Sequence, residues 1–204
     1  MPVDSQGLVN PQSVAEAITR DTVLVAIMHA NNEIGTIQPV QEIGAICRRK
    51  NVFFMVDACQ SFGKLDLNIK TMNIDLLAAT AHKLYGPKGI GLLFASQKDP
   101  KVELHRQMEG GGHERGFRSG TLAVPLIVGF ARAAELSLDR KEKENQRLGE
   151  LRDRLFTGIQ DAHPDIILNG SRNKRLAHNL NLCFPGLDGE TMIMKMERIA
   201  CSTG

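Results

Sequence analysis

Apolar, β-branched runs alternate with amphipathic stretches along the first part of the chain. Buried strands are predicted for four short runs, which are Thr22 to Met28, Val52 to Val56, Ile74 to Thr80 and Gly89 to Ser96. The spacing of apolar residues from Val40 to Lys50 predicts a helix after the first strand. Strands that alternate with helical patterns indicate the α/β class, with a mostly parallel sheet wrapped by helices.

The later part of the chain has a different pattern. A long helix is predicted from Leu126 to about Ala162, and the dense charge in its middle is typical of a solvated helix face. Two short strands, Ile166 to Leu168 and Asn179 to Phe184, and a helix from Gly189 to about Glu197 follow it. This change of pattern predicts the start of a small α+β domain.

Two domains are therefore expected. Residues 1–140 would form part of a large α/β domain, and residues 141–204 a linking helix and part of a small C-terminal domain. The chain opens at a strand-and-turn phrase and stops at CSTG, with no sign of a domain end. We therefore expect both ends to interrupt a longer fold.

Charge and cysteine content narrow the possible partners. Lys and Arg (25) nearly balance Asp and Glu (23), so the net charge of +2 provides no broad field for nucleic acid or an anionic membrane. No apolar run approaches the ~18 residues that span a bilayer. The four cysteines lack CxxC spacing, which favours neither a zinc site nor a disulfide framework. Reduced thiols in the cytoplasm, or in an organelle after loss of a transit peptide, are expected.

Lys83 directly follows a predicted strand and precedes a Gly-Pro turn, in the phrase TAHKLYGPKG. A lysine in this place is expected to be partly desolvated, and its amine could then react with a carbonyl compound. Taken alone, an ordinary loop lysine explains the residue equally well.

Asp57 ends the preceding strand, in the phrase VDACQS. A carboxylate at the end of a buried strand is costly unless a cation or hydrogen-bond donors meet it. Capping of the following helix is the alternative explanation. Asp57 and Lys83 lie one strand–helix–strand unit apart, so their strand ends could be neighbours at the ligand-binding edge of the sheet. Such a pair suits an electron-sink cofactor, since one group can bind its aldehyde and the other can keep its ring nitrogen charged.

Two further phrases contain residues suited to binding. HANNEIG, from His29 to Gly35, offers amide donors, although an Asn-Gly turn explains it without function. GGGHERGFRSGT, from Gly110 to Thr121, combines glycines, arginines and hydroxyls, which suits a loop that binds phosphate or crosses a subunit boundary. A mobile surface loop is the alternative.

Together, HANNEIG, VDACQSFGK, HKLYGPKGIG and GGGHERGFRSGT, in this order and at these separations, resemble the cysteine desulfurases of the IscS/NifS type. These are class-V aminotransferase-group enzymes with the fold-type I architecture of pyridoxal 5'-phosphate-dependent transferases. The resemblance extends from about Val3 to Gly204. It implies pyridoxal 5'-phosphate as cofactor and no metal.

The resemblance also implies roles for individual residues. The implied cofactor-binding positions are Asn32, Asp57, Gln60, Thr80, His82, Lys83 and Thr121. Lys83 would bond to the cofactor aldehyde and, with His82, serve catalysis. Asp57 would pair with the pyridine nitrogen, and Gln60 would donate to the phenolic oxygen of the ring. Asn32 would lie near the ring and the substrate carboxylate.

The implied phosphate contacts extend to a second subunit. Thr80, where the family usually has serine, and His82 would contact the phosphate. Thr121 would reach the phosphate bound by a neighbouring subunit, which implies a homodimer.

The reaction implied is conversion of L-cysteine to L-alanine, with the sulfur carried as an enzyme persulfide to an iron–sulfur scaffold protein or another acceptor. The family's nucleophilic cysteine follows an SSGSAC phrase, and this chain stops at Gly204 before reaching it. Cys201 precedes that motif, and we interpret it as a small core residue. The chain alone is therefore expected to be inactive. Two alternatives stay open, which are a selenocysteine lyase and a catalytically dead chain that serves as a dimerisation or scaffold-binding module.

Overall fold

The computed structural model describes residues 1–203. The chain divides into two compact units. The sheet unit comprises Pro11–His29 and Val40–Lys141, and the hairpin unit comprises Met1–Asn10, Ala30–Pro39 and Glu142–Gly204. Each unit is described separately below.

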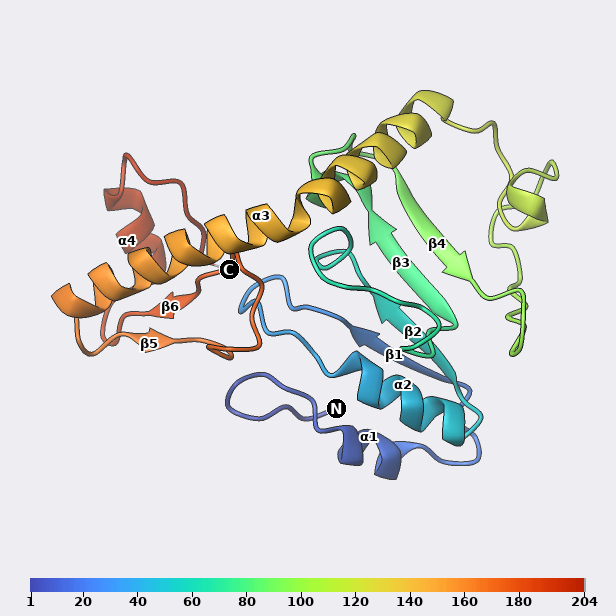
Figure 1. Cartoon of the computed structure of the whole chain (residues 1–204), viewed down its shortest axis with the longest axis horizontal. Coiled ribbons are helices and arrows are strands. Elements are labelled where there is room, and N and C mark those ends of the chain that lie inside the picture. Colours follow the sequence, from blue (N-terminus) through green and yellow to red (C-terminus); the bar gives the residue numbers. More distant parts are fainter. Residues whose placement is uncertain (204) are drawn as a thin grey trace. The chain divides into compact units, whose positions relative to one another are not determined.

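A four-stranded sheet forms the centre of the sheet unit (Figure 1). Its strands, in spatial order, are β1 (Leu24–Met28), β2 (Phe53–Asp57), β3 (Leu76–Thr80) and β4 (Gly91–Ala95). The first three are parallel and β4 is antiparallel to β3, so the predicted mostly parallel sheet is confirmed. Parallel pairing places the carboxyl ends of β1, β2 and β3 at one edge of the sheet.

Helix α2 (Val40–Arg49) supplies much of the core beside β2. Its apolar side chains are buried at the spacing of one helix face, and the helix contacts β2, in which Phe54 and Val56 are fully buried. A Cβ atom on Gly44 would lie 1.9 Å from the carbonyl oxygen of Met72, so only glycine permits this close approach. The short helix α1 (Pro11–Ala17), which contacts α2, is not predicted by the sequence pattern because only Val14 is buried in it.

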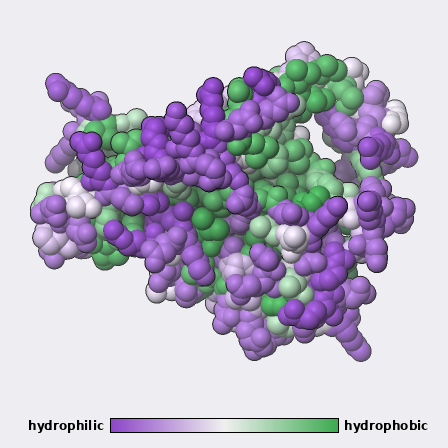
Figure 2. Space-filling view, viewed as in Figure 1, coloured by the Kyte–Doolittle hydropathy of each residue, from purple (hydrophilic) through white to green (hydrophobic). Residues whose placement is uncertain are grey.

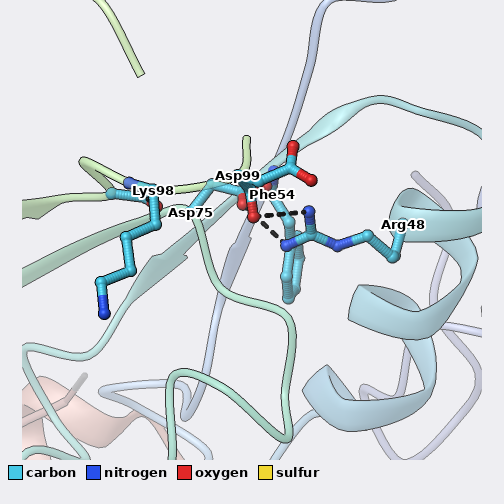
Figure 3. A network of polar contacts seen from close by, with 6 residues as sticks. Arg48, Phe54, Asp75, Lys98 and Asp99 are labelled. Carbon is cyan, nitrogen blue, oxygen red and sulfur yellow. Dashed lines mark hydrogen bonds and ion pairs between the residues drawn. The ribbon is translucent and has the colours of Figure 1, made fainter. Parts of the chain in front are cut away.

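A buried carboxylate joins α2 to the sheet. Asp75, with a side chain only 4% exposed, accepts a hydrogen bond from the backbone N–H of Phe54 through Oδ2, at 2.9 Å. The backbone N–H of Asp75 donates in turn to the carbonyl of Phe54, also at 2.9 Å. The guanidinium of Arg48 reaches from α2 to Asp75 Oδ1 at 3.0 Å (Figure 3). These contacts fix the start of β3 against β2 and α2.

Helix α3 (Val124–Ala162) is 39 residues long and runs through both units, with the boundary after Lys141. In the sheet unit, Phe130 packs edge-on against Phe62 with ring centroids 6.1 Å apart. The charged stretch in the middle of α3 forms a hydrophilic surface, whereas apolar residues gather where this helix begins (Figure 2). Among residues 1–203, no helix is long and apolar enough to cross a membrane.

The hairpin unit contains the antiparallel pair β5 (Ile167–Leu168) and β6 (Leu182–Cys183) and the helix α4 (Gly189–Lys195). The carboxylate of Asp188 caps α4 by accepting a hydrogen bond from Thr191 N at 2.8 Å. The strand predicted from Asn179 is shorter in the structure. Cys201 is exposed, so its interpretation as a core residue is wrong.

We expect Asp75→Ala to lower the free energy of unfolding by about 3 kcal/mol, because it leaves Phe54 N–H without its acceptor and Arg48 without its carboxylate. Urea denaturation followed by circular dichroism measures this change. Arg132→Ala, which breaks an exposed pair with Glu135, is the matched control and should change stability by less than about 0.5 kcal/mol. Equal effects of the two substitutions would contradict the role given to Asp75.

Candidate active site

The parallel strands of the sheet unit bring three strand ends together. Strand register pairs Met28 with Asp57, and Asp57 with Ala78. The hydrogen bonding continues one residue beyond the strands, since His29 N–H donates to the Asp57 carbonyl and Ala58 N–H donates to the Ala78 carbonyl, both at 2.8 Å. Asp57 therefore occupies the central strand end, and the residues that follow β3 lie next to it.

Asp57 is exposed, which corrects the expectation of a carboxylate in a buried place. Its Oδ1 accepts a hydrogen bond from Cys59 N at 2.8 Å and closes a tight turn after β2. The residues that follow β2 form turns and not a helix, so the alternative in which Asp57 caps a following helix is wrong. Because the carboxylate also faces solvent, it remains available to a cationic ligand group.

Lys83 lies in the 3-10 turn η1 (Ala81–Leu84) that directly follows β3. Because a 3-10 helix has three residues per turn, Ala81 and Leu84 lie on the same face and are buried. His82 and Lys83 are exposed. The expected partial desolvation of Lys83 is therefore wrong. Tyr85 ends the turn with φ 61, a left-handed conformation that non-glycine residues rarely adopt.

A hydroxyl and an imidazole are paired beside Lys83. Thr80 Oγ1 and His82 Nδ1 are 2.9 Å apart, so each orients the other. Gln60 is half-buried in the turn after Asp57. The segment from Asp57 to Gln60 and the segment from Thr80 to Lys83 thus follow adjacent parallel strands.

The other two predicted positions, Thr121 and Asn32, do not belong to the turns after β2 and β3. Thr121 is exposed on the long loop after β4, and among residues 1–203 it makes no hydrogen bond to the strand-end residues. The glycine-rich part of this loop is closed by Ser119 Oγ, which donates to the Glu109 carbonyl at 2.7 Å. Asn32 belongs to the hairpin unit, where it is exposed.

Lys64 is a residue of this site that the sequence analysis did not identify, although it ends the quoted phrase VDACQSFGK. Burial lowers its pKa, and the charge of Lys83 lowers the pKa further. The turn that carries Lys64 packs on η1, since a Cβ atom on Gly63 would lie 2.9 Å from Leu84 Cδ2. Two ammonium groups on touching turns make this part of the edge favourable for an anion.

The pKa of the Cys59 thiol is raised, in contrast to the lowered pKa of Lys64. Burial raises the pKa of its thiol to about 11, with further increases from the hydrogen bond and charge of Asp57 and a partial offset from Lys83. A thiol in this state is a poor nucleophile near neutral pH. Among residues 1–203, no group of three or more His, Cys, Asp and Glu side chains could hold a metal ion.

His29, at the end of β1, is also buried, with 4% of its surface exposed. Burial lowers the pKa of its imidazole to about 4, so the ring is neutral at pH 7. Within residues 1–203, its Nδ1 has no hydrogen-bond partner. The neutral ring therefore fills buried space directly after β1 and adds no positive charge near Asp57.

Comparison with known proteins assigns the family. The family described as aminotransferase class-V matches residues 1–204. The chain belongs to the aminotransferase class-V family. Relatives include the proteins named cysteine desulfurase IscS from Dechloromonas aromatica (46% identical) and Ehrlichia chaffeensis (45% identical). Each match covers 100% of this chain and 50% of the relative, so the chain spans half the length of these curated relatives.

Solved structures of similar proteins share the fold. A NifS-like protein superposes with a TM-score of 0.89 at 36% identity, covering 96% of this chain and 53% of that chain. SspA in complex with cysteine superposes with a TM-score of 0.76 at 37% identity, covering 95% of this chain and 52% of that chain. The expected resemblance to the IscS/NifS type and the fold-type I class are confirmed.

The state of Cys59 predicts slow alkylation. With a thiol pKa of about 11, roughly one molecule in a thousand carries the thiolate at pH 8. Iodoacetamide labelling followed by peptide mass spectrometry should therefore modify the exposed Cys183 and Cys201 well before Cys59. Asp57→Asn should speed labelling of Cys59 because it removes a neighbouring negative charge. Labelling of Cys59 as fast as Cys201 would contradict the assigned environment.

The buried His29 predicts a pH-dependent stability. The folded pKa of about 4 lies below the unfolded value near 6.5, so protons bind preferentially to the unfolded chain as pH falls through this window. Between pH 7.5 and pH 5 the chain should lose roughly 2 kcal/mol more stability than a His29→Gln variant. Urea denaturation at both pH values measures the difference. Parallel losses in the two proteins would show that His29 is not buried in the neutral form.

Proposed function

We propose that this chain carries the cofactor-binding residues of a pyridoxal 5'-phosphate-dependent cysteine desulfurase. Such an enzyme converts L-cysteine to L-alanine and passes the sulfur, as an enzyme persulfide, to an iron–sulfur scaffold protein or another acceptor. One observation carries the proposal. An exposed acid, Asp57, and an exposed amine, Lys83, follow adjacent parallel strands at the same edge of one sheet.

The chemistry of this edge fits pyridoxal 5'-phosphate. The cofactor has an aldehyde, a basic ring nitrogen, a phenolic oxygen and a phosphate. The amine of Lys83, the carboxylate of Asp57, the amide of Gln60 and the Thr80–His82 pair offer one suitable partner for each. When bound, the cofactor supplies an electron sink that stabilises negative charge at the substrate Cα.

The other proposed roles of the chain are to orient the side chains that would hold the cofactor and to balance the charges of its ring nitrogen and phosphate. The turn bond from Cys59 N to Asp57 Oδ1 fixes the carboxylate that would keep the ring nitrogen protonated. Thr80 Oγ1 and His82 Nδ1 hold each other in place, and the donor that their mutual hydrogen bond leaves free would bind the phosphate. The positive charge of Lys64 would add to the attraction for that anion.

Cysteine as the substrate is supported by the relatives. Proteins that match the whole of this chain bear the name cysteine desulfurase, and one superposing structure is described as a complex with cysteine. We propose the same substrate here, with Asn32 near its carboxylate.

A homodimer is part of the proposal. Thr121, the residue proposed to reach a second subunit's cofactor, is exposed and is followed by exposed apolar side chains, which are Leu122, Val124, Ile127 and Val128. Exposed apolar side chains close together in the sequence are typical of an interface between protein chains. Hydrophobic residues gather in the part of the surface where α3 begins (Figure 2).

Reductive trapping tests the proposed cofactor lysine. After incubation with pyridoxal 5'-phosphate and borohydride, peptide mass spectrometry of residues 1–204 should find the pyridoxyl group on Lys83. Lys83→Ala should remove most of the adduct, whereas Lys88→Ala, which alters an exposed lysine of the same loop, should leave it unchanged. Label that persists on Lys64 or Lys88 in the Lys83→Ala variant would overturn the assignment.

A further inference from the structure

The turn that carries Asn32 is closed by its own hydrogen bonds. Asn31 N–H donates to the Thr36 carbonyl at 3.0 Å. Asn31 Oδ1 accepts from the N–H groups of Glu33 and Ile34, both at 2.9 Å. Asn32 is thus presented, exposed, at the apex of a compact turn. These local bonds define the shape of the turn but not the direction in which its apex points.

The direction is set by a segment almost 150 residues later in the same unit. Asn179 Nδ2 donates to the Glu33 carbonyl at 2.7 Å, and Asn181 Nδ2 donates to the same oxygen at 3.3 Å. Glu33 is the residue directly after Asn32. Two side-chain amides therefore hold the peptide next to the proposed ligand-binding residue, and the Asn179 bond is the shorter of the two.

Arg175 holds the amide of Asn179 in one orientation. Its Nη1 donates to Asn179 Oδ1 at 2.6 Å, and its Nε donates to the Ser171 carbonyl at 2.9 Å. A guanidinium only donates and the Glu33 carbonyl only accepts, so the Asn179 amide can satisfy both in a single orientation. Arg175 is itself 6% exposed, which limits its movement.

Gly35 shows how closely Asn179 lies on the turn. A Cβ atom on Gly35 would be 2.5 Å from Asn179 Cγ, and Gly35 has φ +70. Leu176 N–H also donates to the Gly35 carbonyl at 3.0 Å. The contact with Asn179 and the hydrogen bond from Leu176 therefore hold the turn against the segment from Arg175 to Asn181. We call this set of contacts the clamp.

We propose that Asn179, held by Arg175, is a positioning residue that orients the Asn32 turn for its ligand. The importance of Asn32 rests on the proposed function, whereas the clamp itself rests only on the contacts above. Asn179 touches neither substrate nor cofactor in this account. It acts by restricting where Asn32 can point.

Asn179→Asp separates the two bonds that Asn179 makes. The aspartate retains an acceptor for Arg175 but loses the donor to the Glu33 carbonyl. Asn173→Asp makes the same chemical change at an exposed position two residues before Arg175 and serves as the matched control. Asn181→Asp removes the longer bond and should have a smaller effect.

Hydrogen exchange of the whole chain without cofactor is the first test. Asn179→Asp should raise the exchange rates of the Glu33 and Ile34 amides by about tenfold, the effect of losing one well-formed hydrogen bond. Asn173→Asp should leave these rates unchanged. Unchanged rates in Asn179→Asp would overturn the proposed clamp.

A double-mutant cycle on cofactor binding is the second test. From the visible absorption band, Asn179→Asp and Asn32→Ala should each raise the dissociation constant for pyridoxal 5'-phosphate by about fivefold to tenfold. In the Asn32→Ala background, Asn179→Asp should add almost nothing, because its effect passes through Asn32. Additive effects would overturn the positioning role. If the unsubstituted chain shows no band, the proposed function fails, and the exchange rates alone decide whether Asn179 holds the turn.

Discussion

The carboxylate of Asp75 accepts hydrogen bonds from the backbone of β2 and from Arg48 of α2 at the point where β3 begins. This contact fixes the parallel register of β2 and β3, in which Asp57 lies opposite Ala78. A slip of one residue would turn every side chain of a strand to the opposite face of the sheet. The separation between Asp57 and the Thr80–Lys83 segment therefore depends on the buried carboxylate of Asp75 at the far end of the same strands.

The two units use different means to position their candidate residues. In the sheet unit, strand register and short turns present Asp57 and Lys83. In the hairpin unit, the Asn32 turn is oriented by side-chain amides from a distant segment. A substitution at Asp75 would weaken the first arrangement, and a substitution at Asn179 would weaken the second.

The sequence pattern predicts the four strands of the sheet, because buried strands consist of short apolar runs that are flanked by turn residues. It also identifies Asp57 and Lys83, since both directly follow such runs. It does not predict that both side chains are exposed, because that depends on the tight turns after β2 and β3. Nor does it predict the clamp on Asn32. Contacts between residues almost 150 positions apart leave no local periodicity, so Asn179 and Arg175 carry no sequence signal of their own.

A crystal structure of the chain grown with pyridoxal 5'-phosphate would show whether this sheet edge binds the cofactor. Electron density should be continuous from Lys83 Nζ, with the ring nitrogen within hydrogen-bonding distance of Asp57 and the phosphate beside Thr80 and His82. Cofactor bound at another surface, or bonded to Lys64 or Lys88, would contradict the assignment of this sheet edge as the active site.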